Sequence, residues 1–432
     1  MRQSLPLNDF EWMSKKELAD FDPLKMCSND SDKGYILEVT LDYPAELHME
    51  HNAFPLAPEH MRIDEKMLSP YAMNALQELT KKKVYTANKL TSSFQRRENY
   101  VCHGLNLRFY LEKGLKLVKI HRGLKFTQED FVRSHIDFFT RKRAQAKTKM
   151  EKDMYKLIIN SLYGKFIENS SNRMDCRFVS SRKAALLRNT DPRTQSHMIL
   201  AESLSIAFMK RSTVKLNQSW AVGFAILELS KLHMQQLFYD YIKPAFNNDV
   251  GVIQSDTDSW ILLTPEPNAD EAVKKLEAYG GIFDTSNYPD DHALRNDSKK
   301  NLTGYLKNEV PGKDILEVCA VRAKTYSIRT EDSLSNRCKG VKMSVRNTIS
   351  IDDYRKCVSR QLAQHEITQH AIQSRSHQNL LVEQKRLAFS SFDDKRFLLC
   401  CGKHSVPYGS CLIQYCAATG KCYFCENPSI LR

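Results

Sequence analysis

The sequence predicts a mixed fold of the α+β class, with helices and antiparallel strands in separate stretches of the chain. Glycine and proline number only 15 and 14 in 432 residues, so most of the chain can form regular elements. Strand patterns occur at 34–43 and 250–263, whereas helical patterns dominate 127–166 and 193–243. A chain of this length is expected to hold about two to four domains or subdomains.

The elements of the first half follow from local patterns. Residues 34–43 alternate apolar and polar side chains and stop at Pro44, which predicts a strand. Residues 45–68 are rich in histidine, proline and acids, and we expect an irregular segment there. Two helices are expected within 127–166, the second ending near Gly164.

The second half is expected to contain long helical segments in 193–243 and a hairpin at 250–263. Residues 268–279 predict a short amphipathic helix, and 283–312 are polar and rich in turn formers. Residues 352–390 are polar and are expected to form a terminal helical subdomain.

The charge of the chain points to an anionic partner. Lysine and arginine number 64 against 51 acids, a formal net charge of +13. Nucleic acid is the first candidate, and a merely solvated basic surface is the alternative. Hydrophobic residues make up 42% of the chain, enough for a sizeable core and too many for a disordered chain.

The N-terminus lacks the apolar core of a signal peptide, and no stretch approaches 18 uninterrupted apolar residues. We therefore expect an intracellular protein without a membrane partner, acting in the nucleus or at a viral replication site. Six of the 12 cysteines are scattered singly, which is typical of a reducing compartment.

The other six cysteines crowd the C-terminal tail. Cys422-Tyr-Phe-Cys425 has the spacing of metal ligands, and His404 is nearby, so a zinc knuckle is one interpretation. A single CxxC without a clear second pair is weak support for a metal. We therefore favour reduced thiols without a structural role over zinc.

The most specific segment is the predicted hairpin, in which two apolar runs flank Ser-Asp-Thr-Asp-Ser at 255–259. Asp256 and Asp258 are two residues apart and would project from one face of an extended backbone. Two carboxylates that close repel each other unless cations lie between them. Such a pair is typical of phosphoryl transfer with two Mg²⁺ ions, whereas an ordinary Asp-rich turn is the alternative.

A basic helix is expected at 141–156, a stretch that contains seven lysines and arginines but only two acids. Lys149, Lys152, Lys156, Asn160 and Tyr163 recur at helical spacing and so share one face. A row of ammonium groups suits a triphosphate, and the aromatic ring followed by Gly164 could admit a base pair. The alternative is a solvated charged face, although the apolar run 157–159 suggests that the helix packs on one side.

These segments resemble a known family. Residues 156–164 (KLIINSLYG) resemble the Kx₃NSxYG element of family B DNA polymerases, and 255–259 (SDTDS) resemble their DTDS element. Residues 324–326 (KTY) resemble the KxY element, and a strand ending in Tyr43-Pro44 precedes all three, in the family's order. The flanking sequence is most similar to the protein-primed branch, especially the polymerases of Polinton/Maverick transposons and related viruses.

The resemblance implies a right-hand polymerase fold with palm, fingers and thumb around an antiparallel palm sheet. The implied divisions are an N-terminal stub (1–30), a first palm strand region with an insertion (31–126), fingers (127–168), an insertion with the rest of the palm (169–335), a thumb (336–412) and a Cys-rich tail (413–432). The proofreading exonuclease domain, which would lie upstream of the palm, is not among these residues, so we expect either a fragment of a longer polymerase or a truncated gene copy.

The resemblance also implies roles for single residues. Asp256 and Asp258 match the metal-binding catalytic pair for two Mg²⁺ ions. Lys156 and Lys152 match the triphosphate contacts, and Asn160 and Tyr163 would line the nascent base pair. Tyr43 matches the residue that excludes the 2′-hydroxyl of a ribonucleotide. Lys324 and Tyr326 match the primer contact.

The first strand departs from the family pattern. Its sequence, EVTLDYP at 38–44, places Glu38 in the usual aspartate position, whereas transposon relatives would place the aspartate where Thr40 stands. Glu38, Thr40 and Asp42 share one face of a strand, so Glu38 or Asp42 could serve as metal ligand or catalytic carboxylate instead. A neutral residue at a metal position would cost several kcal/mol, which is orders of magnitude in rate.

The function implied is template-directed addition of dNTPs to a DNA primer, with a terminal protein as the expected primer at initiation. The alternative is a decayed or domesticated polymerase remnant that binds DNA without synthesis, suggested by Thr40 and the missing exonuclease. A two-metal nuclease is a third candidate, but the basic helix leading into Asn160 would have no role in it.

Overall fold

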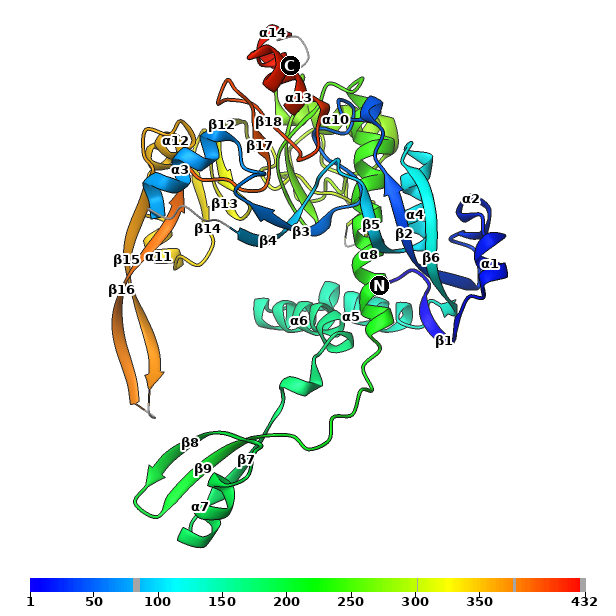
Figure 1. Ribbon diagram of the computed structural model, residues 1–432. Helices are drawn as coiled ribbons and strands as arrows, with labels where there is room; N and C mark the ends of the chain where they lie inside the picture. Colours follow the sequence, from blue (N-terminus) through cyan, green and yellow to red (C-terminus); the bar gives the residue numbers. More distant parts are fainter. Residues whose placement is uncertain (81–85, 301, 376–377, 428–432) are drawn as a thin grey trace. The chain divides into compact units, whose positions relative to one another are not determined.

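The computed structural model describes residues 1–80, 86–300, 302–375 and 378–427, so the end of the predicted Cys-rich tail, 428–432, lies outside the described residues. The chain divides into two compact units (Figure 1). The first comprises Met1–Val132, Leu227–Ile367 and Arg386–Arg432, and the second comprises Arg133–Ile226 and Thr368–Lys385.

The first unit contains a four-stranded antiparallel sheet. Its strand order is β1 (Leu5–Trp12), β6 (Lys116–Glu129), β2 (Lys33–Asp42), β5 (Arg97–His103). The strand predicted at 34–43 is therefore confirmed, and it lies inside the sheet with Leu37 and Val39 fully buried. Because β2 is held on both sides, the residues at its end, Asp42 and Tyr43, are fixed in position.

Residues 1–30, expected to be a stub, take part in this unit. They supply β1, which pairs with β6, and the short helices α1 (Lys15–Ala19) and α2 (Pro23–Met26). The side chain of Glu17 on α1 forms an ion pair with Lys125 on β6 at 2.8 Å. This N-terminal segment is thus an integral part of the first unit.

Two helices follow the sheet strands. Helix α4 (Gly104–Glu112) begins directly after β5, and the amide of its buried Asn106 donates to the Glu228 carbonyl of α8 (Trp220–Gln236) at 2.9 Å. Helix α8 continues into a π-helical turn, η3 (Leu237–Ile242). In the part of the chain that the structure describes, no helix is both long and apolar enough to cross a membrane.

The other elements of the first unit are small. They are η1 (Ala45–Leu47), β3 (Glu59–Asp64), α3 (Pro70–Thr80), β4 (Thr86–Thr91), α9 (Lys243–Ala245), β10 (Gly251–Asp256), β11 (Ser259–Leu263), α10 (Ala269–Gly280), β12 (Ile315–Arg322), β13 (Thr325–Thr330), β14 (Leu334–Cys338), α11 (Met343–Arg346), α12 (Ile351–Val358), β17 (Phe397–Leu398), β18 (Ser405–Val406), α13 (Cys411–Thr419) and α14 (Tyr423–Glu426).

The second unit contains α5 (Arg133–Gln145) and α6 (Lys149–Phe166), which pack on each other, and a three-stranded antiparallel sheet. The sheet order is β7 (Met174–Val179), β9 (Leu204–Lys210), β8 (Thr194–Ala201), with α7 (Arg182–Asn189) between β7 and β8 in the chain. Residues 368–385 of the hairpin β15 (Gln364–Arg375) and β16 (Gln378–Ser390) also belong to this unit.

Several predicted elements are confirmed. Two helices occupy 127–166 as α5 and α6, and the hairpin at 250–263 is β10 and β11. The amphipathic helix at 268–279 is α10, which ends on Gly281 in a left-handed conformation, φ +60°. The mixed fold with antiparallel strands agrees with the predicted α+β class.

The helical prediction for 193–243 is wrong in its first part, because 194–210 forms β8 and β9. Helix formers such as Ala, Leu and Met favoured the helical interpretation. Pairing with β7 overrides that preference, and the buried Ala207 and Met209 alternate with the less buried Ile206 and Phe208, as expected for a half-buried strand. The irregular segment expected at 45–68 likewise contains a strand, β3.

The terminal helical subdomain expected at 352–390 is also wrong beyond α12. Residues 364–375 form β15 and residues 378–390 form β16, which Figure 1 shows as two long strands side by side. Burial along β15 has a period of two, but buried positions include the polar Gln369. Because polar side chains occupy buried positions, hydrophobic periodicity could not reveal this strand.

Candidate active site

The carboxylates Asp256 and Asp258 lie at the tip of the β10–β11 hairpin. Asp256 pairs with Ser259, so Thr257 and Asp258 form the turn. Thr257 has a left-handed backbone, φ +56°, and the Asp258 amide donates to the Asp256 carbonyl at 2.6 Å, which closes a γ-turn. The backbone is therefore not extended at this point, and alternation along a strand does not describe how the two carboxylates project.

An aromatic cluster at its base anchors the hairpin. The Trp260 ring of β11 packs against Phe54 at 5.9 Å and against Phe238 of η3 at 6.2 Å, centroid to centroid. The flanking apolar runs are less buried than expected, since Ile253 is 40% and Leu263 is 54% exposed. Packing of Trp260, rather than burial of both strands, fixes the hairpin base.

Lys324 joins the hairpin to the next sheet. It lies in the turn between β12 and β13 with φ +62°, an uncommon conformation for a residue other than glycine. Its Nζ atom contacts both carboxylate oxygens of Asp256, at 2.7 and 2.8 Å. The structure thus brings together Asp256 and Lys324, while Tyr326 lies half-buried on β13.

The carboxylates of β2 are each paired with an arginine. Glu38 forms an ion pair with Arg122, its neighbour on β6, and its side chain is only 16% exposed. Asp42 is 43% exposed and lies 3.5 Å from Arg96. Within the described residues, Glu38, Asp256 and Asp258 do not form a three-ligand group around a common point. Asp42 is the more accessible of the two strand carboxylates.

Thr40 lies between Glu38 and Asp42 at a site where both neighbouring strands bulge. Its hydroxyl donates to Glu98 Oε2 at 2.9 Å and contacts His121 Nε2 at 2.8 Å, and Thr40 is 2% exposed. In β5, Glu98 and Asn99 together lie opposite Thr40, and in β6 His121 is an extra residue between the partners of Glu38 and Val39. The Thr40 hydroxyl bond holds the pKa of Glu98 below its ordinary value, with help from Arg96.

Tyr43 follows β2 and is 8% exposed. Its hydroxyl accepts a hydrogen bond from the Leu56 amide at 3.2 Å and lies 2.7 Å from His51 Nδ1. Its ring packs on Phe94 at 4.7 Å, centroid to centroid. The hydroxyl is thus held by the segment 43–56.

Burial of His51 beside Tyr43 makes the stability of the first unit sensitive to acid. The Tyr43 hydroxyl can donate to His51 Nδ1 only while that nitrogen carries no proton, and burial lowers the pKa of His51 from its ordinary 6.5 to about 4. Because His51 binds a proton more readily in the unfolded chain than in the folded one, the free energy of unfolding is highest above pH 6.5. It decreases as the pH falls from 6.5 towards 4. This amounts to about 2 kcal/mol at pH 5.

Urea unfolding at pH 7 and pH 5 checks this expectation. The variant His51→Asn should be less stable than the wild type at pH 7 but lose less stability on acidification. Burial also lowers the pKa of His103 to about 4, and this residue is common to both proteins, so the difference between their losses reports His51. Equal losses in the two proteins would contradict the assignment.

The predicted nucleotide contacts lie on α6 in the second unit. The helix begins with a capping box in which the Thr148 hydroxyl accepts from the Glu151 amide and the Glu151 side chain accepts from Thr148. Lys152, Lys156 and Asn160 are exposed and Tyr163 is half-buried. Within the apolar run 157–159, Leu157 is 68% exposed, whereas Ile158 and Ile159 are half-buried and α6 packs on α5.

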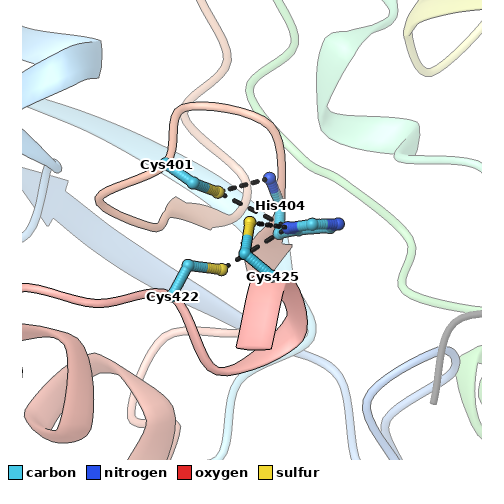
Figure 2. A group of neighbouring side chains, drawn as sticks. All are labelled: Cys401, His404, Cys422 and Cys425. Carbon is cyan, nitrogen blue, oxygen red and sulfur yellow. Dashed lines mark hydrogen bonds between the residues drawn. The ribbon is translucent and has the colours of Figure 1, made fainter. Parts of the chain in front are cut away.

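The C-terminal cysteines form a cluster that sequence reasoning did not favour. Figure 2 shows Cys401, His404, Cys422 and Cys425 converging, and their ligand atoms all lie within 4.8 Å of one another. They are a candidate metal site. The missed feature is Cys401-Gly-Lys-His404, a CxxH pair that complements the CxxC pair. Glu98 and His121 were also missed, because no local pattern shows which residues bulge towards Thr40.

Comparison with known proteins defines the class. The family described as DNA polymerase type B, organellar and viral, matches residues 40–244. Over this segment the chain is similar to the type B DNA polymerases, and the predicted recognition and right-hand fold class agree with this match. The match begins at Thr40 and includes α6 with the Kx₃NSxYG element, whereas the DTD hairpin and Lys324 lie beyond it. Comparison with curated proteins finds no match.

Among solved structures, the chain is similar to Phi29 DNA polymerase complexed with primer-template DNA, in a post-translocation binary complex and in a ternary complex with incoming nucleotide substrates. Identity is 14% in both, with TM-scores of 0.43 and 0.45. The alignments cover 83% of this chain and 58% of the Phi29 chain. The chain thus spans less than two thirds of the length of these structures.

Proposed function

We propose that the chain catalyses template-directed DNA synthesis, in which the 3′-hydroxyl of a primer attacks the α-phosphate of a dNTP and pyrophosphate leaves. The observation that carries the proposal is the ion pair between Asp256 and Lys324. These residues belong to two elements, DTDS and KxY, that the family resemblance assigns to one reaction. Their contact within the first unit supports a common site for catalysis and primer.

The hairpin carboxylates suit Mg²⁺. Carboxylate oxygens are the ligands that this hard cation prefers. The Lys324 ammonium, which contacts both Asp256 oxygens, shows that a positive charge is accommodated at this position. Asp256 and Asp258 would hold the metal, with Asp42 or Glu38 from β2. When bound, two Mg²⁺ ions would lower the pKa of the primer hydroxyl and stabilise the charge on the leaving pyrophosphate.

Among the strand residues we assign the catalytic role to Asp42. Thr40 is neutral and its hydroxyl is committed to Glu98 and His121, and Glu38 is committed to Arg122. Asp42 is more exposed and its contact with Arg96 is longer, at 3.5 Å. A carboxylate with a weak, exposed partner can exchange that partner for a cation at small cost.

The remaining roles follow the family. Lys152 and Lys156 would bind the triphosphate of the incoming dNTP, and Asn160 and Tyr163 would line its base pair with the template. Tyr43 would exclude ribonucleotides, and Lys324 with Tyr326 would hold the primer strand. The palm would comprise the first strand region within 31–126 and the palm part of 169–335, α5 and α6 would form the fingers, and 336–412 the thumb. A terminal protein would supply the first hydroxyl.

Primer extension tests the proposal. The wild-type chain, with Mg²⁺, dNTPs and a primed template, is expected to add the nucleotide complementary to the template base, and to switch nucleotide when that base is changed. Asp258→Asn serves as the inactive control. Salt-dependent DNA binding with no extension at any Mg²⁺ concentration would favour the remnant alternative. Degradation of DNA without dNTP incorporation would favour a nuclease.

Gly164 offers a test in which stability and activity move in opposite directions. A Cβ atom at this position would meet nothing within 4 Å, so packing does not explain a glycine in the last part of α6. Gly164→Ala should stabilise the helix by up to about 1 kcal/mol. If the open space receives the nascent base pair, the same variant should raise the KM for dNTP at least severalfold.

Thermal unfolding and steady-state incorporation would measure the two effects on one preparation. Met150→Ala, at an 82% exposed position of the same helix outside the Kx₃NSxYG element, is the control. It should leave the KM for dNTP unchanged. An unchanged KM in a stabilised Gly164→Ala protein would contradict the base-pair role.

A further inference from the structure

We propose that Cys401, His404, Cys422 and Cys425 bind one zinc ion. This ion would hold the C-terminal segment, residues 397–426, against residues 43–56, which we call the Tyr43 loop. His404 Nδ1 lies 3.4 Å from the sulfur of Cys401, 3.4 Å from that of Cys422 and 3.6 Å from that of Cys425. Tetrahedral zinc, with Zn–S about 2.3 Å and Zn–N about 2.0–2.1 Å, places nitrogen and sulfur about 3.6 Å apart. The side chains already have the spacing of a zinc site.

The donor set selects zinc. Three thiolates and one imidazole form the Cys₃His set of structural zinc sites, whereas Mg²⁺ and Ca²⁺ require oxygen ligands. The sequence spacing, Cys401-x₂-His404 followed by Cys422-x₂-Cys425, supplies one ligand pair from the β17–β18 loop and one from the start of the short helix α14. Four protein ligands leave no open position, so the site would be structural rather than catalytic.

The first ligand loop is shaped as a metal-binding turn. It connects β17 and β18, and Gly402 takes a left-handed conformation, φ +68°. This turn directs the amides of Lys403 and His404 at the Cys401 sulfur, each at 3.4 Å. Backbone donors of this kind stabilise a thiolate. The second pair is held by a turn in which the Cys425 amide donates to the Cys422 carbonyl at 3.0 Å.

The cluster is built on a small core. Cys422 is 4% exposed, and the His404 ring packs against Phe424 at 5.4 Å. Leu399, Val406 and Leu412 complete the core beneath the site. So small a core contributes little stability by itself, and modules of this size usually depend on a metal or on disulfides. None of the cysteines in the described residues forms a disulfide. A bound metal is therefore the remaining means of linking the two ligand pairs.

The zinc-bound segment would brace the Tyr43 loop. The Cys411 amide, at the start of α13, donates to His48 Nδ1 at 3.0 Å. The His48 ring stacks on Phe94 at 4.3 Å, and Phe94 in turn packs on Tyr43. The Phe94 amide also donates to the Tyr408 carbonyl at 2.6 Å. Ordering of the C-terminal segment should therefore restrict the motion of the residues that contact Tyr43.

Metal content of the wild-type chain is the first test. Reduced protein purified without chelator is expected to carry about one zinc per chain by elemental analysis. Cobalt exchanged into the site should give the intense visible absorption of a tetrahedral thiolate complex, which reports the ligands without any mutation. Reduced protein that holds no zinc and takes up none on titration would overturn the proposal.

Variants then identify the ligands. Cys422→Ser and His404→Ala should each weaken zinc binding at least tenfold, whereas His404→Cys should retain it as a four-thiolate site. Cys400→Ser, next to the cluster but outside it, is the matched control and should keep full zinc content. Zinc retained by Cys422→Ser, or lost equally from Cys400→Ser, would contradict the assigned ligands.

Hydrogen exchange tests the brace without relying on the proposed polymerase activity. Removing zinc from the wild-type chain with a chelator should speed amide exchange in 43–56 and 93–95, with full recovery when zinc is added back. Amides of β7 and β9 in the second unit are the internal control and should not change. Unchanged exchange in 43–56 would show that the metal, even if bound, does not brace this loop.

Discussion

Replacing Asp258 by Asn is expected to lower the rate of primer extension by about a thousandfold or more, which corresponds to about 4 kcal/mol of transition-state stabilisation. Asp258 lies exposed in the turn of the β10–β11 hairpin. The hydrogen bond from the Asp258 amide to the Asp256 carbonyl is made by the backbone, so asparagine at position 258 preserves it. The substitution therefore removes a charge from the proposed metal site while leaving the turn intact.

The measurement is single-turnover incorporation with saturating dNTP and Mg²⁺, so that the chemical step is observed. Circular dichroism and the unfolding midpoint of Asp258→Asn should match the wild type. Asp314→Asn, an exposed aspartate just before β12, makes the same change in net charge and should retain full activity. Extension by Asp258→Asn at more than a tenth of the wild-type rate would remove Asp258 from the catalytic assignment.

Asp256→Asn should lose activity to a similar degree but with an additional consequence. Its carboxylate contacts Lys324, whose backbone is in a left-handed turn conformation. Neutralising Asp256 releases that ammonium and should also weaken primer binding, whereas Asp258→Asn should not. Comparing the rate of incorporation and the affinity for primer in the two variants thus separates loss of catalysis from loss of the contact between Asp256 and Lys324.

The sequence predicted those parts of the site that local pattern determines. The hairpin was evident because two apolar runs flank a polar turn, and α6 because lysines recur at helical spacing. The strand ending at Tyr43 was evident from its alternation and Pro44. In each case the residues that form the element are neighbours in the chain, so their spacing carries the information.

What the sequence could not show depends on contacts between distant residues. Thr40 meets Glu98 and His121 only because two bulges shift the register of β5 and β6. The pair Cys401 and His404 is separated in the chain from the pair Cys422 and Cys425 by α13. Their approach therefore depends on the folded arrangement of this segment and not on local spacing alone. The hairpin β15–β16 was mistaken for helix because its buried face includes polar side chains such as Gln369.

Tyr43 is expected to control sugar selection through its ring and stability through its hydroxyl, and two substitutions separate these roles. Tyr43→Ala removes the ring that would collide with a 2′-hydroxyl, and should raise ribonucleotide incorporation relative to deoxynucleotide by about a hundredfold. Tyr43→Phe keeps the ring and should preserve selectivity. It leaves His51 and the Leu56 amide without their partner, which should cost about 1–3 kcal/mol.

Selectivity is measured as the ratio of kcat/KM for the two nucleotides on one preparation, and stability by urea unfolding. Because both nucleotides need the same folded chain, partial unfolding of Tyr43→Ala cancels in the ratio, even though its cavity should cost about 3–5 kcal/mol. An unchanged ratio in Tyr43→Ala would remove Tyr43 from sugar selection. A changed ratio in Tyr43→Phe would instead move that role to the hydroxyl and the His51 network, since the ring would still be in place.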